Sequence, residues 1–209
     1  MSEWFLSNRK VQSFVRLVTA LSFAFFTAYQ IYTAMQTASN RTGRLIGVCL
    51  YLTITLAAFF SFSYSPRLQN ARSIMMLVSL SLLFMIRLIN LPALLRNPVF
   101  ANLPSFLNFA AYVLPQIGTV VITVMWVRRR RPFVTVKAIA PLIPVVIAIY
   151  ALCFAAECVL MICYRMNVDG SLKLALLSRL MYFAGFSGTT FIFFFNDPAK
   201  PFEPEVIVV

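Results

Sequence analysis

Six long apolar stretches fill most of this 209-residue chain. A helix needs about 20 apolar residues to cross the hydrocarbon core of a bilayer, and each stretch has about that length. The sequence therefore predicts an all-α fold, a polytopic membrane helix bundle of about six transmembrane helices. We expect residues 1–196 to form this single domain and residues 197–209 a short cytoplasmic tail. The predicted helices lie at roughly 12–35, 44–64, 73–95, 105–127, 138–163 and 172–195.

The composition agrees with a membrane protein. Hydrophobic residues make up 61% of the chain and charged residues 11%, with a mean hydropathy of +0.84. A water-soluble domain of this composition could not cover its surface with polar groups. The net charge of +12 would suggest a nucleic-acid partner in a soluble protein. Here the basic residues gather at the ends of the apolar stretches, so we expect a lipid bilayer and no nucleic acid as partner.

The distribution of basic residues predicts the orientation of the chain. Basic residues are frequent before the first stretch, between the second and third, and between the fourth and fifth, and the alternate connections hold fewer. Because positively charged connections favour the cytoplasmic side, both termini are predicted to be cytoplasmic. The residues that carry this bias are Arg9, Lys10, Arg16, Arg67, Arg72, Arg128, Arg129, Arg130, Arg131 and Lys137.

Three charged residues lie deep inside the predicted spans, more than five positions from either end, namely Arg87, Glu157 and Arg179. A rise of 1.5 Å per residue puts them about 12, 9 and 10 Å from the outer ends of their helices. A charge costs roughly 2.5–3.5 kcal/mol at the centre of a membrane helix, so each needs a partner or water. A shared outer-half pocket with two arginines and one carboxylate would be net positive. Since an arginine fork suits carboxylate or phosphate oxygens, we expect a small anionic or zwitterionic solute there.

Two polar residues complete the predicted substrate-binding set. Asn90 lies one turn from Arg87 on the same helix face, and Gln116 lies near the midplane. Both would add hydrogen bonds to the solute. Other interpretations stay open: Glu157 could pair with one arginine to lock the bundle, the charges could form an ion or proton path, and the amides could join helices.

Small residues recur at every fourth position in the first apolar stretch. Ala20, Ala24 and Ala28 share one helix face, which lets another helix approach closely. This favours packing within the bundle or docking to a partner membrane subunit. The alanine stripe is similar to that on the first helix of the substrate-binding subunits of energy-coupling-factor vitamin transporters, which are also small six-helix proteins. The glycine-rich loop patterns of those subunits are missing from this chain, which has six glycines.

The side-chain inventory does not favour an enzyme. The chain has no histidine, the commonest general base and metal ligand. Glu157 is the one acidic residue within the predicted spans, too few for an acidic dyad or a two-metal site. Cys158 and Cys163 are five residues apart and so point from different helix faces. We therefore expect no catalytic residues, no metal and no cofactor.

The sequence thus favours a transporter, or the substrate-binding subunit of one, that takes a small anionic solute from the outer side. The alternative is a non-transporting membrane sensor or an assembly and regulatory subunit whose buried charges pair with a partner protein. An ion channel ranks third, because a channel needs a continuous polar stripe and the inner half is expected to offer little beyond Gln116.

Overall fold

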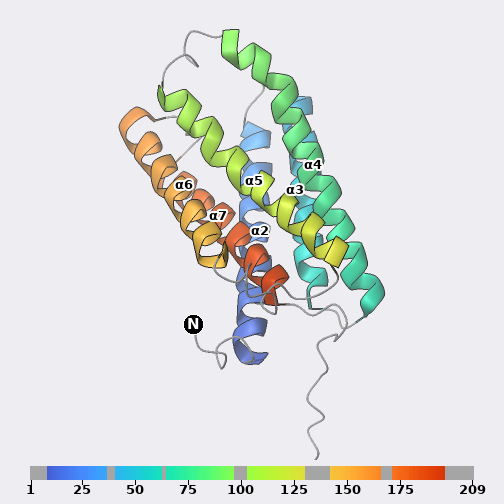
Figure 1. Cartoon of the computed structure of the whole chain (residues 1–209). Helices are drawn as coiled ribbons and strands as arrows, with labels where there is room; N and C mark the ends of the chain where they lie inside the picture. Colours follow the sequence, from blue (N-terminus) through green and yellow to red (C-terminus); the bar gives the residue numbers. More distant parts are fainter. Residues whose placement is uncertain are drawn as a thin grey trace, which may run out of the picture.

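The chain is an all-α helix bundle (Figure 1). The computed structural model describes residues 9–36, 41–62, 65–96, 103–129, 142–165 and 171–195. These segments form six helices, and the predicted fold class is confirmed. The helices are α2 (Arg9–Gln36), α3 (Arg41–Phe60), α4 (Pro66–Arg96), α5 (Leu103–Arg129), α6 (Leu142–Tyr164) and α7 (Leu172–Phe195).

Local sequence signals explain several helix ends. Residue Arg165, directly after α6, has a φ of 49°, a left-handed conformation that commonly terminates a helix. The carbonyl of Ser171 accepts a 2.9 Å hydrogen bond from the amide of Ala175, as expected of a residue that caps the start of α7. Pro144 lies in the first turn of α6, where a missing amide hydrogen costs nothing. The largest difference from the predicted bounds is in α4, which begins several residues before the predicted start at 73.

Five helices pack in a ring, with α6 added to one side. α2 packs against α3 and α7, α3 against α4, α4 against α5, and α5 against α7, which closes the ring. α6 packs mainly against α5 and α7 (Figure 1). One side of α6 is buried against these two neighbours. Its other sides expose large apolar residues such as Leu152 and Ile162.

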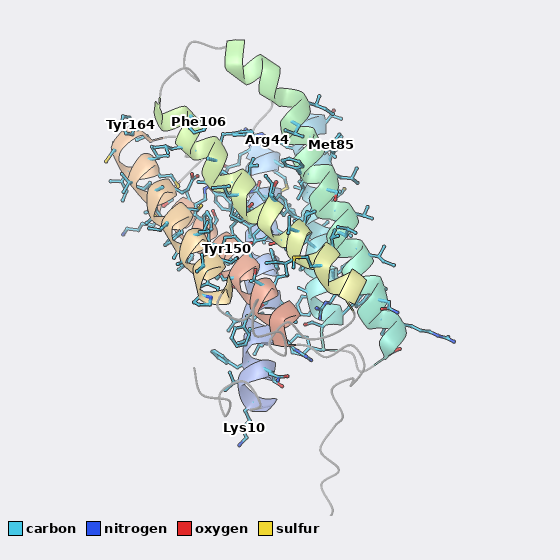
Figure 2. The ribbon with its side chains drawn as sticks, viewed as in Figure 1. Lys10, Arg44, Met85, Phe106, Tyr150 and Tyr164 are labelled. Carbon is cyan, nitrogen blue, oxygen red and sulfur yellow. The ribbon has the colours of Figure 1, made fainter. Side chains whose placement is uncertain are left out.

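The helices run up and down along the long direction of the molecule. Figure 2 shows Lys10 at one end and Arg44, Phe106 and Tyr164 towards the opposite end. The start of α3, the start of α5 and the end of α6 thus lie towards the same end. Following the predicted orientation, we call this the outer end and that of Lys10 the inner end.

Four described segments are long and apolar enough to cross a membrane. They are Lys10–Gln36, Thr42–Phe60, Phe106–Met125 and Pro144–Tyr164. A shorter apolar segment, Asn70–Ile86, belongs to α4. α7 is not among the four, and its apolar run is interrupted by Lys173, Arg179 and several serines and threonines. The length and hydropathy of these helices fit a membrane location.

The predicted alanine stripe of α2 is divided between the inside and the outside of the chain. Ala20 is fully buried in the main core cluster, Ala24 is half-buried and Ala28 is exposed. The close approach of α2 to α7 depends instead on two glycines of α7. A methyl group at Gly185 would lie 2.9 Å from the ring of Phe23, and one at Gly188 would collide with the hydroxyl of Thr19. Small residues of α7 therefore let α2 and α7 pack closely.

Candidate functional site

Helical spacing places Glu157 on the buried face of α6. Tyr150, Cys153, Glu157 and Leu160 follow one another at intervals of three or four residues, and all four are buried. Residues at this spacing share one side of a helix, and this side faces α5 and α7. The carboxylate of Glu157 is 0% exposed. Its charge must therefore be balanced by its neighbours.

Two helices supply those neighbours. Nε of Arg179, in α7, lies 3.2 Å from Oε1 of Glu157 and forms an ion pair with it. Nδ2 of Asn108, in α5, lies within hydrogen-bond distance of both carboxylate oxygens, 3.1 Å from Oε1 and 2.9 Å from Oε2. Each residue comes from a different helix, so the carboxylate joins α5, α6 and α7.

An aromatic ring completes the site. The guanidinium carbon of Arg179 lies 4.4 Å from the ring centroid of Tyr112, one turn along α5 from Asn108. A guanidinium over an aromatic face is attracted by the electrons of the ring, more strongly where water is excluded. Arg179 is 6% exposed and Tyr112 is equally buried. We call Asn108, Tyr112, Glu157 and Arg179 the Glu157–Arg179 centre.

Gln116 is connected to this centre through Tyr182. The hydroxyl of Tyr182 donates a 3.0 Å hydrogen bond to the backbone carbonyl of Tyr112, and Nε2 of Gln116 donates a 3.2 Å hydrogen bond to that hydroxyl. Tyr182 is one turn from Arg179 on the same face of α7. The amide oxygen Oε1 of Gln116 is buried and has no hydrogen-bond partner among the described residues. A buried acceptor of this kind is costly unless it finds a donor.

Polar residues continue along α5 beyond Gln116. The hydroxyl of Thr119 is 3.3 Å from that of Tyr150, which also donates a 3.3 Å hydrogen bond to the carbonyl of Pro115. Thr123, one turn further, donates to the carbonyl of Thr119 at 2.7 Å. The expectation that the inner half holds little beyond Gln116 was therefore too narrow. The buried polar line of α5 consists of Asn108, Tyr112, Gln116, Thr119 and Thr123, over about 22 Å of helix.

The predicted set of five is brought together only in part. Glu157 and Arg179 are in contact, and Gln116 reaches them through Tyr182. Arg87 and Asn90 belong to α4, but their side chains lie outside the described residues. The sequence assigned no role to α5 residues other than Gln116, yet Asn108 and Tyr112 hold the charged pair. Their signal was the repeat of polar residues every three or four positions within an otherwise apolar helix.

Two further buried arginines lie near the inner end. The sequence suggested only that basic residues there set the orientation of the chain in the membrane. Arg16 of α2 donates a 2.9 Å hydrogen bond from a terminal guanidinium nitrogen to the carbonyl of Ser61, directly after α3. Arg72 of α4, just before the predicted span, is also buried. The positive charge of Arg16 acts on Arg72, so the two buried arginines repel each other.

The described residues contain no group of three histidine, cysteine, aspartate or glutamate side chains that could hold a metal ion. Comparison of the chain with protein-family models, with curated proteins and with solved structures found no match. Its function is therefore inferred from the arrangement of its own residues.

Proposed function

We propose that this protein is a multi-pass integral membrane protein that binds a small anionic solute at the Glu157–Arg179 centre, as a transporter or as the substrate-binding subunit of one. The bundle supports the membrane part of this proposal, because four of its helices have the length and hydropathy of membrane spans. The site supports solute binding, because a guanidinium and an amide group already surround one carboxylate there.

The observation that carries the proposal is that these donors already hold a carboxylate. A guanidinium from α7 and an amide from α5 converge on Glu157, and the ring of Tyr112 holds the guanidinium in place. A solute carboxylate or phosphate would need the same donors. Glu157 and Arg179 face each other inside the chain, so neither charge needs a second protein as its partner.

Gln116 gives a second requirement for the solute. Its buried Oε1 accepts no hydrogen bond from the described residues, so it is suited to a hydroxyl or ammonium group. Gln116 lies one turn beyond Tyr112, about 6 Å along the axis of α5. The preferred solute therefore carries an anionic group together with a hydrogen-bond donor.

The polar line of α5 favours transport over binding alone. It continues from the Glu157–Arg179 centre past Gln116 to Thr119 and Thr123, towards the inner end. Polar groups buried between membrane helices commonly mark the route of a substrate or an ion. A solute held at Arg179 would meet these groups next as it moved inwards.

A thermal-shift experiment with matched probes tests the proposal. L-lactate and propionate share a carboxylate, but only lactate has a hydroxyl group for Gln116. Added at about 100 times its dissociation constant, a ligand stabilises the fold by roughly 2.7 kcal/mol. We expect lactate to raise the melting temperature of the purified protein more than propionate does, and inorganic phosphate and amino acids serve as further probes.

Two variants with matched controls assign the effect to the site. Gln116→Leu should remove the preference for lactate over propionate, whereas Gln30→Leu, half-buried in α2, should retain it. Arg179→Lys keeps a positive charge beside Glu157 but loses the planar fork, so both probes should bind about tenfold more weakly. The exposed Arg67→Ala should bind as the wild type does. Equal responses in Arg179→Lys and the wild type would refute the proposed site.

A further inference from the structure

In the structure, Arg179 is occupied by a carboxylate of the chain itself. Its Nε lies 3.2 Å from Glu157, and the amide of Asn108 reaches both oxygens of that carboxylate. Glu157 is fully buried, so bulk water does not compete for these contacts. A solute anion can take over Arg179 only if the negative charge of Glu157 is moved away or neutralised, since two carboxylates on one guanidinium would repel each other.

We propose that Glu157 is a proton-binding site coupled to the solute, and that each monoanionic solute binds together with one proton taken up by Glu157. This inference rests on the proposed function. A proton from the aqueous phase bonds to one carboxylate oxygen of Glu157, and the ion pair with Arg179 breaks. The solute anion then pairs with Arg179. Proton and anion together add no net charge to the buried site.

The surroundings of Glu157 suit this exchange. The described charged or titratable groups near it include Arg179 and Tyr182 on α7, Tyr112 on α5, and Cys153 and Cys158 on α6. Arg179 is permanently charged, so neutralising Glu157 removes the carboxylate that pairs with it. A buried cation that loses a counter-ion is disfavoured, and a solute anion restores the balance. The amide of Asn108 can still donate to a protonated carboxyl group.

The pH dependence of lactate binding tests the coupling. Lactate stays a monoanion between about pH 5.5 and about pH 8, so any change in affinity over this range arises from the protein. Where Glu157 is ionised in the free protein, the dissociation constant of the wild type should rise about tenfold for each unit of pH. Calorimetry in buffers of different ionisation enthalpy should give an uptake of about one proton per lactate bound.

Two variants separate this coupling from a purely structural ion pair. Glu157→Gln mimics the protonated state, so its affinity for lactate should not change with pH, and lactate should stabilise it more than it stabilises the wild type at about pH 8. Cys158→Ala, next to Glu157, should keep the slope of the wild type. If Glu157→Gln does not fold, infrared difference spectra of the wild type still test the inference, because lactate should produce the C=O band of a protonated carboxyl group.

The outcomes distinguish this inference from the proposed function. Binding of lactate by the wild type with no dependence on pH and no proton uptake would overturn the coupling, and solute binding at Arg179 would remain. If none of the probes binds to the wild type or to Glu157→Gln at any pH, both the solute site and its coupling to protons are wrong. The ion pair then serves to hold α6 against α5 and α7.

Discussion

The two sides of α7 hold their neighbours in different ways. Towards α2, α7 presents Gly185 and Gly188, and the backbone approaches Phe23 and Thr19 so closely that a methyl group would not fit. Towards α5 and α6, it presents Arg179 and Tyr182, which make an ion pair and hydrogen bonds. In the proposed membrane location, burial of apolar surface gives helices little drive to associate, because lipid is as apolar as a leucine side chain. Close packing and polar contacts hold such helices together instead. α7 uses close packing towards α2 and polar contacts towards α5 and α6.

This contrast has a functional consequence. The α2 side has a single close-packed arrangement, so it is suited to a fixed scaffold. In the proposed function, the groups on the α5–α6 side exchange partners when Glu157 is protonated or when a solute anion arrives. We therefore expect motion linked to solute binding to occur between α6 and its two neighbours, while α2 and α7 stay together.

The largest effect is expected from Arg179→Ala. Removal of the guanidinium takes away a counter-ion of the buried Glu157 carboxylate, which costs about 3–5 kcal/mol. Equilibrium unfolding in mixed detergent micelles measures this loss. The double variant Glu157→Gln with Arg179→Gln removes both charges of the ion pair and should recover much of the stability. A single variant as stable as the wild type would show that the polar side of α7 does not hold the bundle.

The close-packed side is tested by Gly188→Ala. The new methyl group collides with the hydroxyl of Thr19, which itself donates a 2.7 Å hydrogen bond to the carbonyl of Val15. Overpacking of this kind costs about 1–3 kcal/mol of unfolding free energy. Combination with Thr19→Ala should reduce that cost, as a double-mutant cycle would show. Gly47→Ala is the control, because a methyl group there meets nothing within 4 Å.

A smaller effect is expected from Tyr182→Phe. This change removes the hydroxyl that joins Gln116 to the carbonyl of Tyr112 but keeps the ring in the aromatic core. Hydrogen bonds between membrane helices contribute about 0.6 kcal/mol each, so a loss of about 1 kcal/mol is expected in the same unfolding assay. Tyr32→Phe, at an exposed position of α2, should change nothing. A loss as large as that of Arg179→Ala would mean that the hydroxyl, and not the ion pair, organises this side.

The smallest effect on stability is expected at Ala28. This residue is exposed on α2, so Ala28→Leu should change the unfolding free energy by less than about 0.5 kcal/mol. Ala28 is also the member of the alanine stripe that the bundle leaves open to another helix. If α2 docks to a partner membrane subunit, Ala28→Leu should weaken a complex isolated in mild detergent while leaving the monomer folded. An unchanged complex would assign the stripe to packing within the bundle.

The sequence by itself determined the number and approximate positions of the helices. Apolar runs of about 20 residues can satisfy their backbone only as helices when water is absent, so length and hydropathy were sufficient for this step. The sequence also singled out Glu157 and Arg179, since charges in such runs are expensive and stand out. The sequence did not predict the burial of Arg16 and Arg72, because arginines near helix ends usually lie outside the membrane and set the orientation of the helices.

Only the tertiary structure decided which helices meet and which partners these charges have. Periodicity places Glu157 on one face of α6, but it carries no information on which helices that face will meet. The packing of α6 against α5 and α7 brought Asn108 to the carboxylate and Tyr112 to the guanidinium. Likewise, Gly188 is an ordinary helix position in the sequence and becomes a close contact only because α2 crosses there. Partner choice depends on packing between distant segments, and for that reason the residues alone did not reveal it.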